Sequence, residues 1–179
     1  MDPKGKSEEE KKEIEAAAEG SEPETNGAMK EGETLPQITL KDNQDQDVDV
    51  SSLITADQGV IFFTYPKRLH CFSTSQACNF RDSYAEFGKH GYKVYGLSTD
   101  SPADQESWNK EKKFGYPLLS DPQSELIKKL GAFASPKNTV RAHFIFEKGT
   151  GKLLQGKLKV KPAEDAKHCL KFIEKHHSA

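Results

Sequence analysis

The sequence predicts a mixed α/β fold in which helices flank a central sheet. Residues 60–65 form a continuous β-branched and aromatic run, which is typical of a strand buried on both faces. Residues 77–87 then place apolar side chains three and four positions apart, as one face of a helix requires. Further strand and helix patterns alternate after this point and end in a hairpin and a helix. That order favours a layered α/β domain.

The first 34 residues have a different composition from the rest. They hold eleven acidic side chains against five lysines, whereas the remainder carries a net charge of +4. Their few large apolar groups cannot offset the entropy cost of ordering the chain. We therefore expect residues 1–34 to be a disordered acidic extension and residues 35–179 to be the folded domain. The lysine pairs near the N-terminus are compatible with a nuclear address, but the preferred interpretation of the segment is a solubilising tail.

The remaining elements can be predicted from turn and capping residues. Residues 35–40 and 48–53 are short apolar stretches around a polar turn at 42–47, which indicates a hairpin. The helix that follows the 60–65 strand is expected to end near Gly88 or Gly91, and residues 92–98 form the next strand.

Two helix starts follow the same rule. Ser101-Pro102 and Asp121-Pro122 each place a capping residue before a proline, and Gly131 is expected to close the second helix. Residues 140–146 and 152–160 flank a glycine-bearing turn and predict a second hairpin. Residues 162–177 predict a last helix with Cys169 on its apolar face. This order describes a thioredoxin-like fold with a central mixed sheet flanked by helices.

The chain has three cysteines, of which Cys71 and Cys78 lie seven positions apart between the 60–65 strand and the helix. In a reducing compartment this spacing is more typical of redox or metal chemistry than of a structural disulfide. A helix N-terminus stabilises a thiolate, and the thiolate is the reactive form of cysteine. A peroxide-reducing site also needs a cation to orient the peroxide. A metal site built from His70 and the two cysteines lacks a further pair with ligand spacing.

The motifs of this segment resemble a known family. Tyr65-Pro66-Lys67, Gln76-Ala77-Cys78 and Phe80-Arg81-Asp82 are similar to the active-site segment of Q-type (bacterioferritin-comigratory-protein) peroxiredoxins, especially the fungal nuclear thiol peroxidases. The resemblance covers residues 35–177 through several more motifs: Gly96-Leu97-Ser98, Leu118-Leu119-Ser120-Asp121-Pro122, Leu130-Gly131 and Val140-Arg141-Ala142-His143-Phe144-Ile145-Phe146. It implies a thioredoxin-fold thiol peroxidase that reduces hydrogen peroxide and alkyl hydroperoxides and is recycled by thioredoxin, without a cofactor or a bound metal.

The family pattern is Pro-x-x-x-Thr-x-x-Cys, with a resolving cysteine five residues later. Aligned without gaps, Pro66 matches the proline and Cys78 the resolving cysteine, but His70 replaces the threonine and Ser73 the peroxidatic cysteine. A serine hydroxyl cannot reduce a peroxide. Because the divergence is confined to residues 68–73, compensating frameshifts in the gene model are one hypothesis, which resequencing the transcript tests.

Each site residue has two interpretations. Ser73 with Gln76 has the spacing of a helix capping box, which favours a structural cap over a catalytic role. Cys71 is the candidate displaced peroxidatic thiol, just outside the helix. Cys78 is either a resolving thiol or a small buried hydrophobe. Arg141 lies in a strand that is otherwise apolar, and the resemblance assigns it the role of orienting the peroxide rather than that of a plain ion pair.

For the other two candidates we prefer a role without chemistry: His70 is expected to be an exposed loop residue and Cys169 a core residue. Two further hypotheses compete with the peroxidase: a pseudo-peroxidase that serves as a redox-responsive binding or regulatory module, and an oxidoreductase that uses Cys78 alone. We expect a monomer that is nuclear or cytoplasmic. We also expect no membrane span, because no run approaches about 18 apolar residues. We expect no direct nucleic-acid binding, because neither the acidic segment nor the mildly basic domain demands such a partner.

Overall fold

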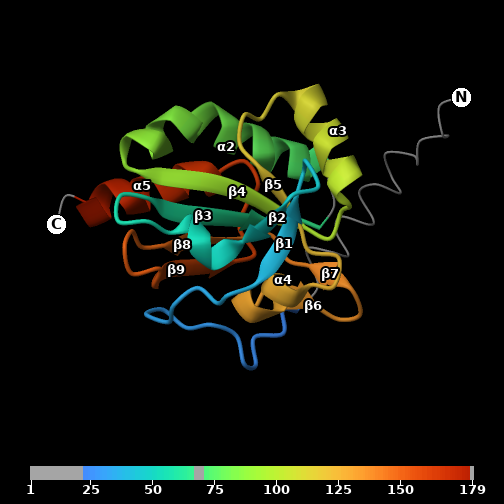
Figure 1. Ribbon diagram of the computed structural model, residues 1–179, viewed down its shortest axis with the longest axis horizontal. Helices are drawn as coiled ribbons and strands as arrows, with labels where there is room; N and C mark the ends of the chain where they lie inside the picture. Colours follow the sequence, from blue (N-terminus) through green and yellow to red (C-terminus); the bar gives the residue numbers. More distant parts are fainter. Residues whose placement is uncertain (1–21, 67–70, 178–179) are drawn as a thin grey trace, which may run out of the picture.

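The architecture is a seven-stranded sheet with helices on both faces (Figure 1). It comes from a computed structural model that describes residues 22–66 and 71–177, with the backbone alone for Cys71 and Phe72. The strands are β1 (Thr39–Asp42), β2 (Asp47–Asp49), β3 (Gly59–Thr64), β4 (Tyr92–Ser98), β5 (Leu118–Ser120), β6 (Phe133–Ala134), β7 (Asn138–Thr139), β8 (Ala142–Phe146) and β9 (Leu153–Leu158). The helices are η1 (Val50–Leu53), α2 (Cys71–Lys89), α3 (Pro102–Lys112), α4 (Glu125–Leu130) and α5 (Asp165–His177).

The strand order in the main sheet is β2-β1-β5-β4-β3-β8-β9. Strands β3, β4 and β5 are parallel, and β1, β8 and β9 pair antiparallel with their neighbours. This is the mixed central sheet that the sequence predicts. Every residue of β3 is buried, as its uninterrupted apolar run predicts for a strand with both faces covered.

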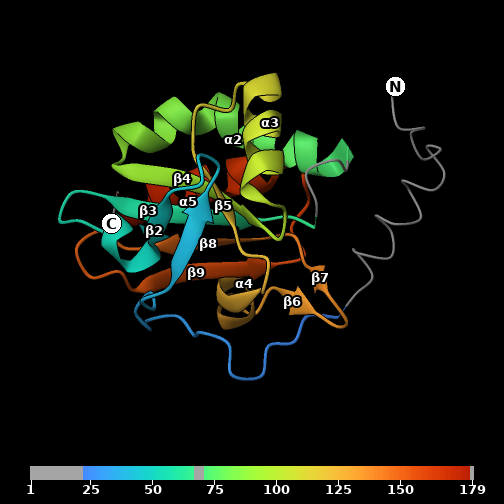
Figure 2. The same ribbon diagram turned by 45° about the vertical axis from the view of Figure 1, so that its right-hand side comes forward.

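Alternate side chains of β3 enter two different cores. Ile61 and Phe63 pack with α2, α3 and α5, and Phe63 stacks on Phe80 of α2 at 4.5 Å between ring centroids. Val60 and Phe62 pack on the opposite face with α4. Figure 2 shows α2 and α3 on one side of the sheet and α4 on the other.

The structure corrects several predicted boundaries. The helix expected at Asp121-Pro122 begins at Glu125, although the Asp121 carboxylate still caps it by accepting hydrogen bonds from the backbone N–H groups of Glu125 and Ile127. Gly131 closes that helix with a φ of 81°, as predicted. The first strand is shorter than predicted, and the short pair β6 and β7 has no counterpart in the sequence analysis.

The predicted disordered extension is partly ordered. Residues 22–34 lie along α4 and β9, where Glu24 and Met29 donate backbone hydrogen bonds to the carbonyls of Phe133 and Lys129. Gly32 donates to the carbonyl of Leu153. Residues 1–21 lie outside the described part of the chain. None of the helices within the described part is long and apolar enough to cross a membrane.

Candidate active site

Arg141 is a buried cation next to the start of β8. Only 4% of its surface is exposed, and its carbonyl accepts a hydrogen bond from the backbone of Val160. Its Nη1 donates to the Ser73 hydroxyl at 3.0 Å and to the Gln76 Oε1 at 3.2 Å. The side chain therefore connects the start of β8 to the first two described turns of α2. A buried guanidinium needs such partners because its desolvation cost is large.

Ser73 does not cap α2. The structure describes α2 from Cys71 on, so Ser73 lies inside the helix and the capping-box interpretation is wrong. Gln76 follows three residues later, and residues three apart share a face of a helix. Both side chains are fully buried on the face that meets Arg141. The structure thus brings Ser73 and Arg141 together.

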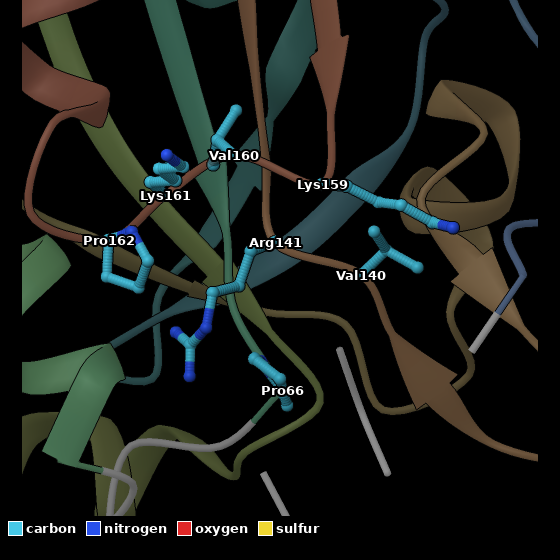
Figure 3. A pocket seen from close by; sticks show the side chains of 7 residues that line it. All are labelled: Pro66, Val140, Arg141, Lys159, Val160, Lys161 and Pro162. Atoms are coloured by element: carbon cyan, nitrogen blue, oxygen red, sulfur yellow. The ribbon is translucent and has the colours of Figure 1, made fainter. Parts of the chain in front are cut away.

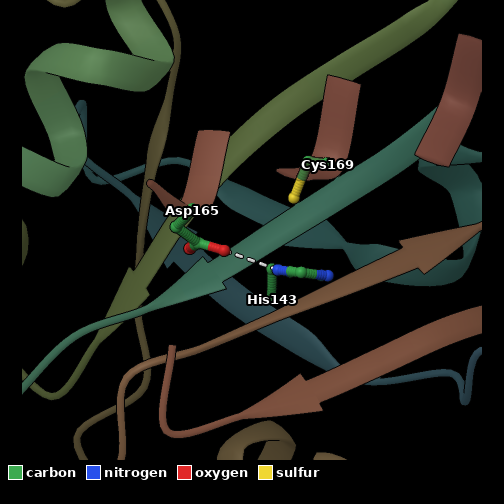
Figure 4. Close-up of side chains that lie close together, drawn as sticks. All are labelled: His143, Asp165 and Cys169. Carbon is green, nitrogen blue, oxygen red and sulfur yellow. Dashed lines mark hydrogen bonds and ion pairs between the residues drawn. The ribbon is translucent and has the colours of Figure 1, made fainter. Parts of the chain in front are cut away.

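A line of buried hydrogen bonds continues from Gln76 away from Ser73. The Gln76 Nε2 donates to Asp165 Oδ2 at 3.0 Å, and Asp165 Oδ1 contacts His143 Nδ1 at 2.5 Å. His143 Nε2 contacts Gln155 Oε1 at 2.8 Å. Figure 4 shows Asp165, at the start of α5, facing the His143 ring on β8. Four elements, α2, α5, β8 and β9, are therefore linked through polar groups inside the fold.

A pocket of about 230 Å³ opens beside Arg141. It is lined by Pro66, Val140, Arg141, Lys159, Val160, Lys161 and Pro162. Arg141 extends between the two prolines, whereas the side chains of Lys159 and Lys161 extend away from it (Figure 3). The pocket can admit a small molecule, since a water takes up about 30 Å³ of liquid volume.

The cysteines occupy three different environments. Cys71 lies in α2, not just outside it, and is the first residue of the helix that the structure describes; its side chain lies outside the described part. Cys78 is a half-buried free thiol one residue after Ala77, whose carbonyl accepts a hydrogen bond from the Tyr116 hydroxyl at 2.5 Å. His70 lies outside the described residues.

Cys169 is a core residue, as predicted. It is fully buried, and burial raises the pKa of its thiol well above the ordinary value. Its sulfur, a His143 nitrogen and an Asp165 oxygen lie within 4.8 Å of one another, which is a ligand set that zinc accepts. The imidazole and the carboxylate are already hydrogen-bonded to each other, so this cluster is satisfied without an ion.

Sequence reasoning missed His143 and Asp165 as parts of the site and gave Gln76 only a capping role. A signal was present for His143, because a histidine within the buried run 140–146 needs a polar partner. Asp165 gave no signal of its own, because acidic residues are common in the first turn of a helix.

Comparisons with known proteins agree on one family. Residues 32–153 match the family model described as "AhpC/TSA family". The chain is 41% identical over 132 residues to Peroxiredoxin bcp1 of Schizosaccharomyces pombe, covering 73% of this chain and 67% of that protein. It is 31% identical over 149 residues to chloroplastic Peroxiredoxin Q of Gentiana triflora, covering 82% and 67%. The crystal structure of Peroxidoxin BcpB from Mycobacterium tuberculosis superposes with a TM-score of 0.76 at 27% identity, covering 82% of this chain and 97% of that one.

Proposed function

Because the chain belongs to the AhpC/TSA family and is a peroxiredoxin, we propose that it reduces hydrogen peroxide and alkyl hydroperoxides through Cys71 and is recycled by thioredoxin. The observation that carries this proposal is the buried Arg141 guanidinium, which contacts the first two turns of α2 beside a pocket. A fixed cation in a water-poor site stabilises the negative charge that develops on peroxide oxygen as the O–O bond breaks.

The proposed nucleophile is Cys71. The described part of α2 starts with this residue, and unpaired backbone N–H groups and the helix dipole favour an anion near a helix N-terminus. These groups lower the pKa of a cysteine and so raise the share of reactive thiolate. The Ser73 hydroxyl cannot substitute, because it is neither ionised at neutral pH nor able to exchange two electrons.

The chemistry balances in three steps. The thiolate attacks one peroxide oxygen, the O–O bond breaks, and the departing oxygen takes up a proton to leave as water or an alcohol. The sulfur is left as a sulfenic acid. The Cys78 thiol then attacks that sulfur, an S–S bond forms and water leaves. Two electrons and two protons from the dithiol of thioredoxin restore both cysteines.

The resolving step requires a change in α2. Seven residues of α-helix rise about 10 Å, whereas cysteines joined by a disulfide have Cα atoms about 6 Å apart. The first turns of α2 must therefore unwind before Cys78 can reach the oxidised sulfur. The half-buried position of Cys78 suits a thiol that is packed in the reduced form and exposed by this unwinding.

A second candidate is a catalytically impaired peroxiredoxin that serves as a redox-responsive binding module. The Ser73–Arg141 hydrogen bond favours it, because the hydroxyl occupies the contact that a peroxidatic thiol would make. In this case the pocket beside Arg141 would bind a ligand without turning it over.

One assay separates the two candidates. Purified protein is supplied with peroxide, thioredoxin, thioredoxin reductase and NADPH, and NADPH loss is followed. The peroxidase proposal expects turnover that disappears in Cys71→Ala and persists in Cys169→Ala. Turnover no faster than that of the Cys71→Ala variant would reject it and support the binding module. The expected nuclear or cytoplasmic location and the monomeric state stay predictions, which a tagged full-length chain and sedimentation would test.

A further inference from the structure

The polar groups behind Arg141 differ from a typical apolar core. Gln76, His143 and Asp165 are each at most 1% exposed, yet they lie between the sheet and α2. Burying a carboxylate is costly unless hydrogen bonds compensate for the lost water. Asp165 receives that compensation from Gln76 on one oxygen and His143 on the other. Packing alone therefore does not explain why these three polar side chains are buried here.

The donors and acceptors around Gln76 fix the orientation of its amide. Arg141 offers only donors, so it must face the amide oxygen, as it does at 3.2 Å. The Asp165 carboxylate offers only acceptors, so it must face the amide NH₂. If the amide were rotated by half a turn, its NH₂ would face the Arg141 donor and its oxygen would face the Asp165 carboxylate. The Gln76 NH₂ also donates to the Thr64 carbonyl, at a longer 3.4 Å. The carboxylate, at 3.0 Å, is thus the stronger of two acceptors that favour the amide orientation in which Arg141 has an acceptor.

His143 fixes the carboxylate in turn. Its Nδ1 contacts Asp165 Oδ1, and its Nε2 contacts Gln155 Oε1 on the neighbouring strand β9. Because β8 and β9 are paired strands, the ring is held from the sheet. Asp165 is also the first residue of α5, where the helix dipole favours its negative charge. Its position is determined by both the sheet and α5.

We propose that Asp165, braced by His143, is a positioning residue that orients Gln76 and, through it, the Arg141 guanidinium against position 73. The inference deepens the proposed function, on which it rests for the use of Arg141, but it concerns the geometry of the cation rather than the identity of the nucleophile. Loss of the acceptor at position 165 leaves the Gln76 NH₂ with only the 3.4 Å contact to the Thr64 carbonyl, so the amide holds Arg141 less firmly at one of its two contacts on α2.

The test uses an introduced thiol as a reporter of Arg141. In the full-length chain, Cys71→Ala and Cys78→Ala remove the native thiols of the segment, and Ser73→Cys places a sulfur at the contact with Arg141. The pKa of that thiol is measured from its alkylation rate against pH. Arg141 is expected to hold it below the ordinary value of about 8.5. Asp165→Leu, which is similar in size and lacks an acceptor, is expected to raise it by about one unit. Asp165→Asn keeps an oxygen for Gln76 and is expected to leave it within a few tenths of a unit.

The controls separate positioning from loss of structure. Asp121→Leu removes another buried carboxylate, which caps α4 far in sequence from α2, and is expected to leave the thiol pKa unchanged. Gln76→Met is expected to raise the pKa as Asp165→Leu does, and the two together no further, because they break one line of contacts. If Asp165→Leu does not fold, the shorter Asp165→Val is compared in the same way.

The outcome is decisive whether or not the natural chain turns over peroxide. An unchanged thiol pKa in folded Asp165→Leu, or equal shifts in Asp165→Leu and Asp121→Leu, would overturn the positioning role. A thiol pKa that rises in Asp165→Leu but not in Asp165→Asn would support the positioning role, even if the NADPH assay rejects the peroxidase.

Discussion

Arg141 and Ser73 face each other across the candidate active site, yet the two sides that carry them are built differently. The side of β8 and α5 is a buried hydrogen-bond network, in which Arg141, His143 and Asp165 all have partners. The first turn of α2 instead offers a serine hydroxyl to the cation, with a cysteine two positions earlier in the chain. In the proposed mechanism, the charge-stabilising cation is therefore in place, whereas the nucleophile has to come from another position than the one facing Arg141.

The largest expected effect comes from a change on the side of β8 and α5. Arg141→Met removes the cation while keeping much of its apolar stem, and we expect kcat/KM for peroxide to fall by roughly 100-fold, the usual effect of losing one stabilising donor. Steady-state kinetics with thioredoxin measure it. The control is Lys171→Met on the exposed face of α5, which is expected to change nothing. Equal losses in the two variants would contradict a specific role for Arg141.

The next effect concerns the altered side. Ser73→Cys restores a thiol 3 Å from Arg141, where the cation stabilises the thiolate. We expect the second-order rate of reaction with hydrogen peroxide to rise about tenfold over that of the natural chain. Stopped-flow measurement with Ser75→Cys as a matched control checks this. A rate that does not rise would mean that the pocket no longer activates peroxide.

A third prediction separates the thiols by environment. Because burial raises the pKa of Cys169, its thiol stays protonated in the folded chain, so iodoacetamide at neutral pH is expected to label Cys78 and leave Cys169 unlabelled. The unfolded chain releases this proton above about pH 8.5, so the Cys169 thiol lowers the stability of the fold as the pH rises past that value. Peptide mass spectrometry and urea unfolding at pH 7 and 9.5 test the two statements, with Cys169→Ala expected to lose less stability at pH 9.5.

The smallest effect concerns the unwinding of α2. Tyr116→Phe removes the hydrogen bond to the Ala77 carbonyl next to Cys78, at a cost of about 1 kcal/mol in the free energy of unfolding. If this bond restrains the helix, the variant forms its Cys71–Cys78 disulfide a few times faster after a peroxide pulse. The control is Tyr84→Phe, which removes a hydroxyl from α2 itself. A slower disulfide in Tyr116→Phe would argue that α2 resolves without unwinding.

Much of the fold could be predicted because its signals are local. The β3 run, the Ser101 cap and the Gly131 stop each depend on a few neighbouring residues, and the structure confirms all three. The role of Ser73 as a cap was wrong because the helix extends at least three residues further toward the N-terminus than its spacing with Gln76 suggests. The Gln76–Asp165–His143 line could not be predicted, since it joins residues from three elements up to 89 positions apart.

The most direct test of the account is to identify which sulfurs react with peroxide. The full-length reduced chain is exposed to one equivalent of hydrogen peroxide, quenched with an alkylating reagent and mapped by mass spectrometry, with and without Cys71→Ala. The account predicts a Cys71–Cys78 disulfide in the natural chain and none in the variant, with Cys169 still reduced in both. Recovery of Cys71 and Cys78 as alkylated thiols after peroxide treatment would contradict the proposal that this peroxiredoxin uses Cys71 as its peroxidatic residue.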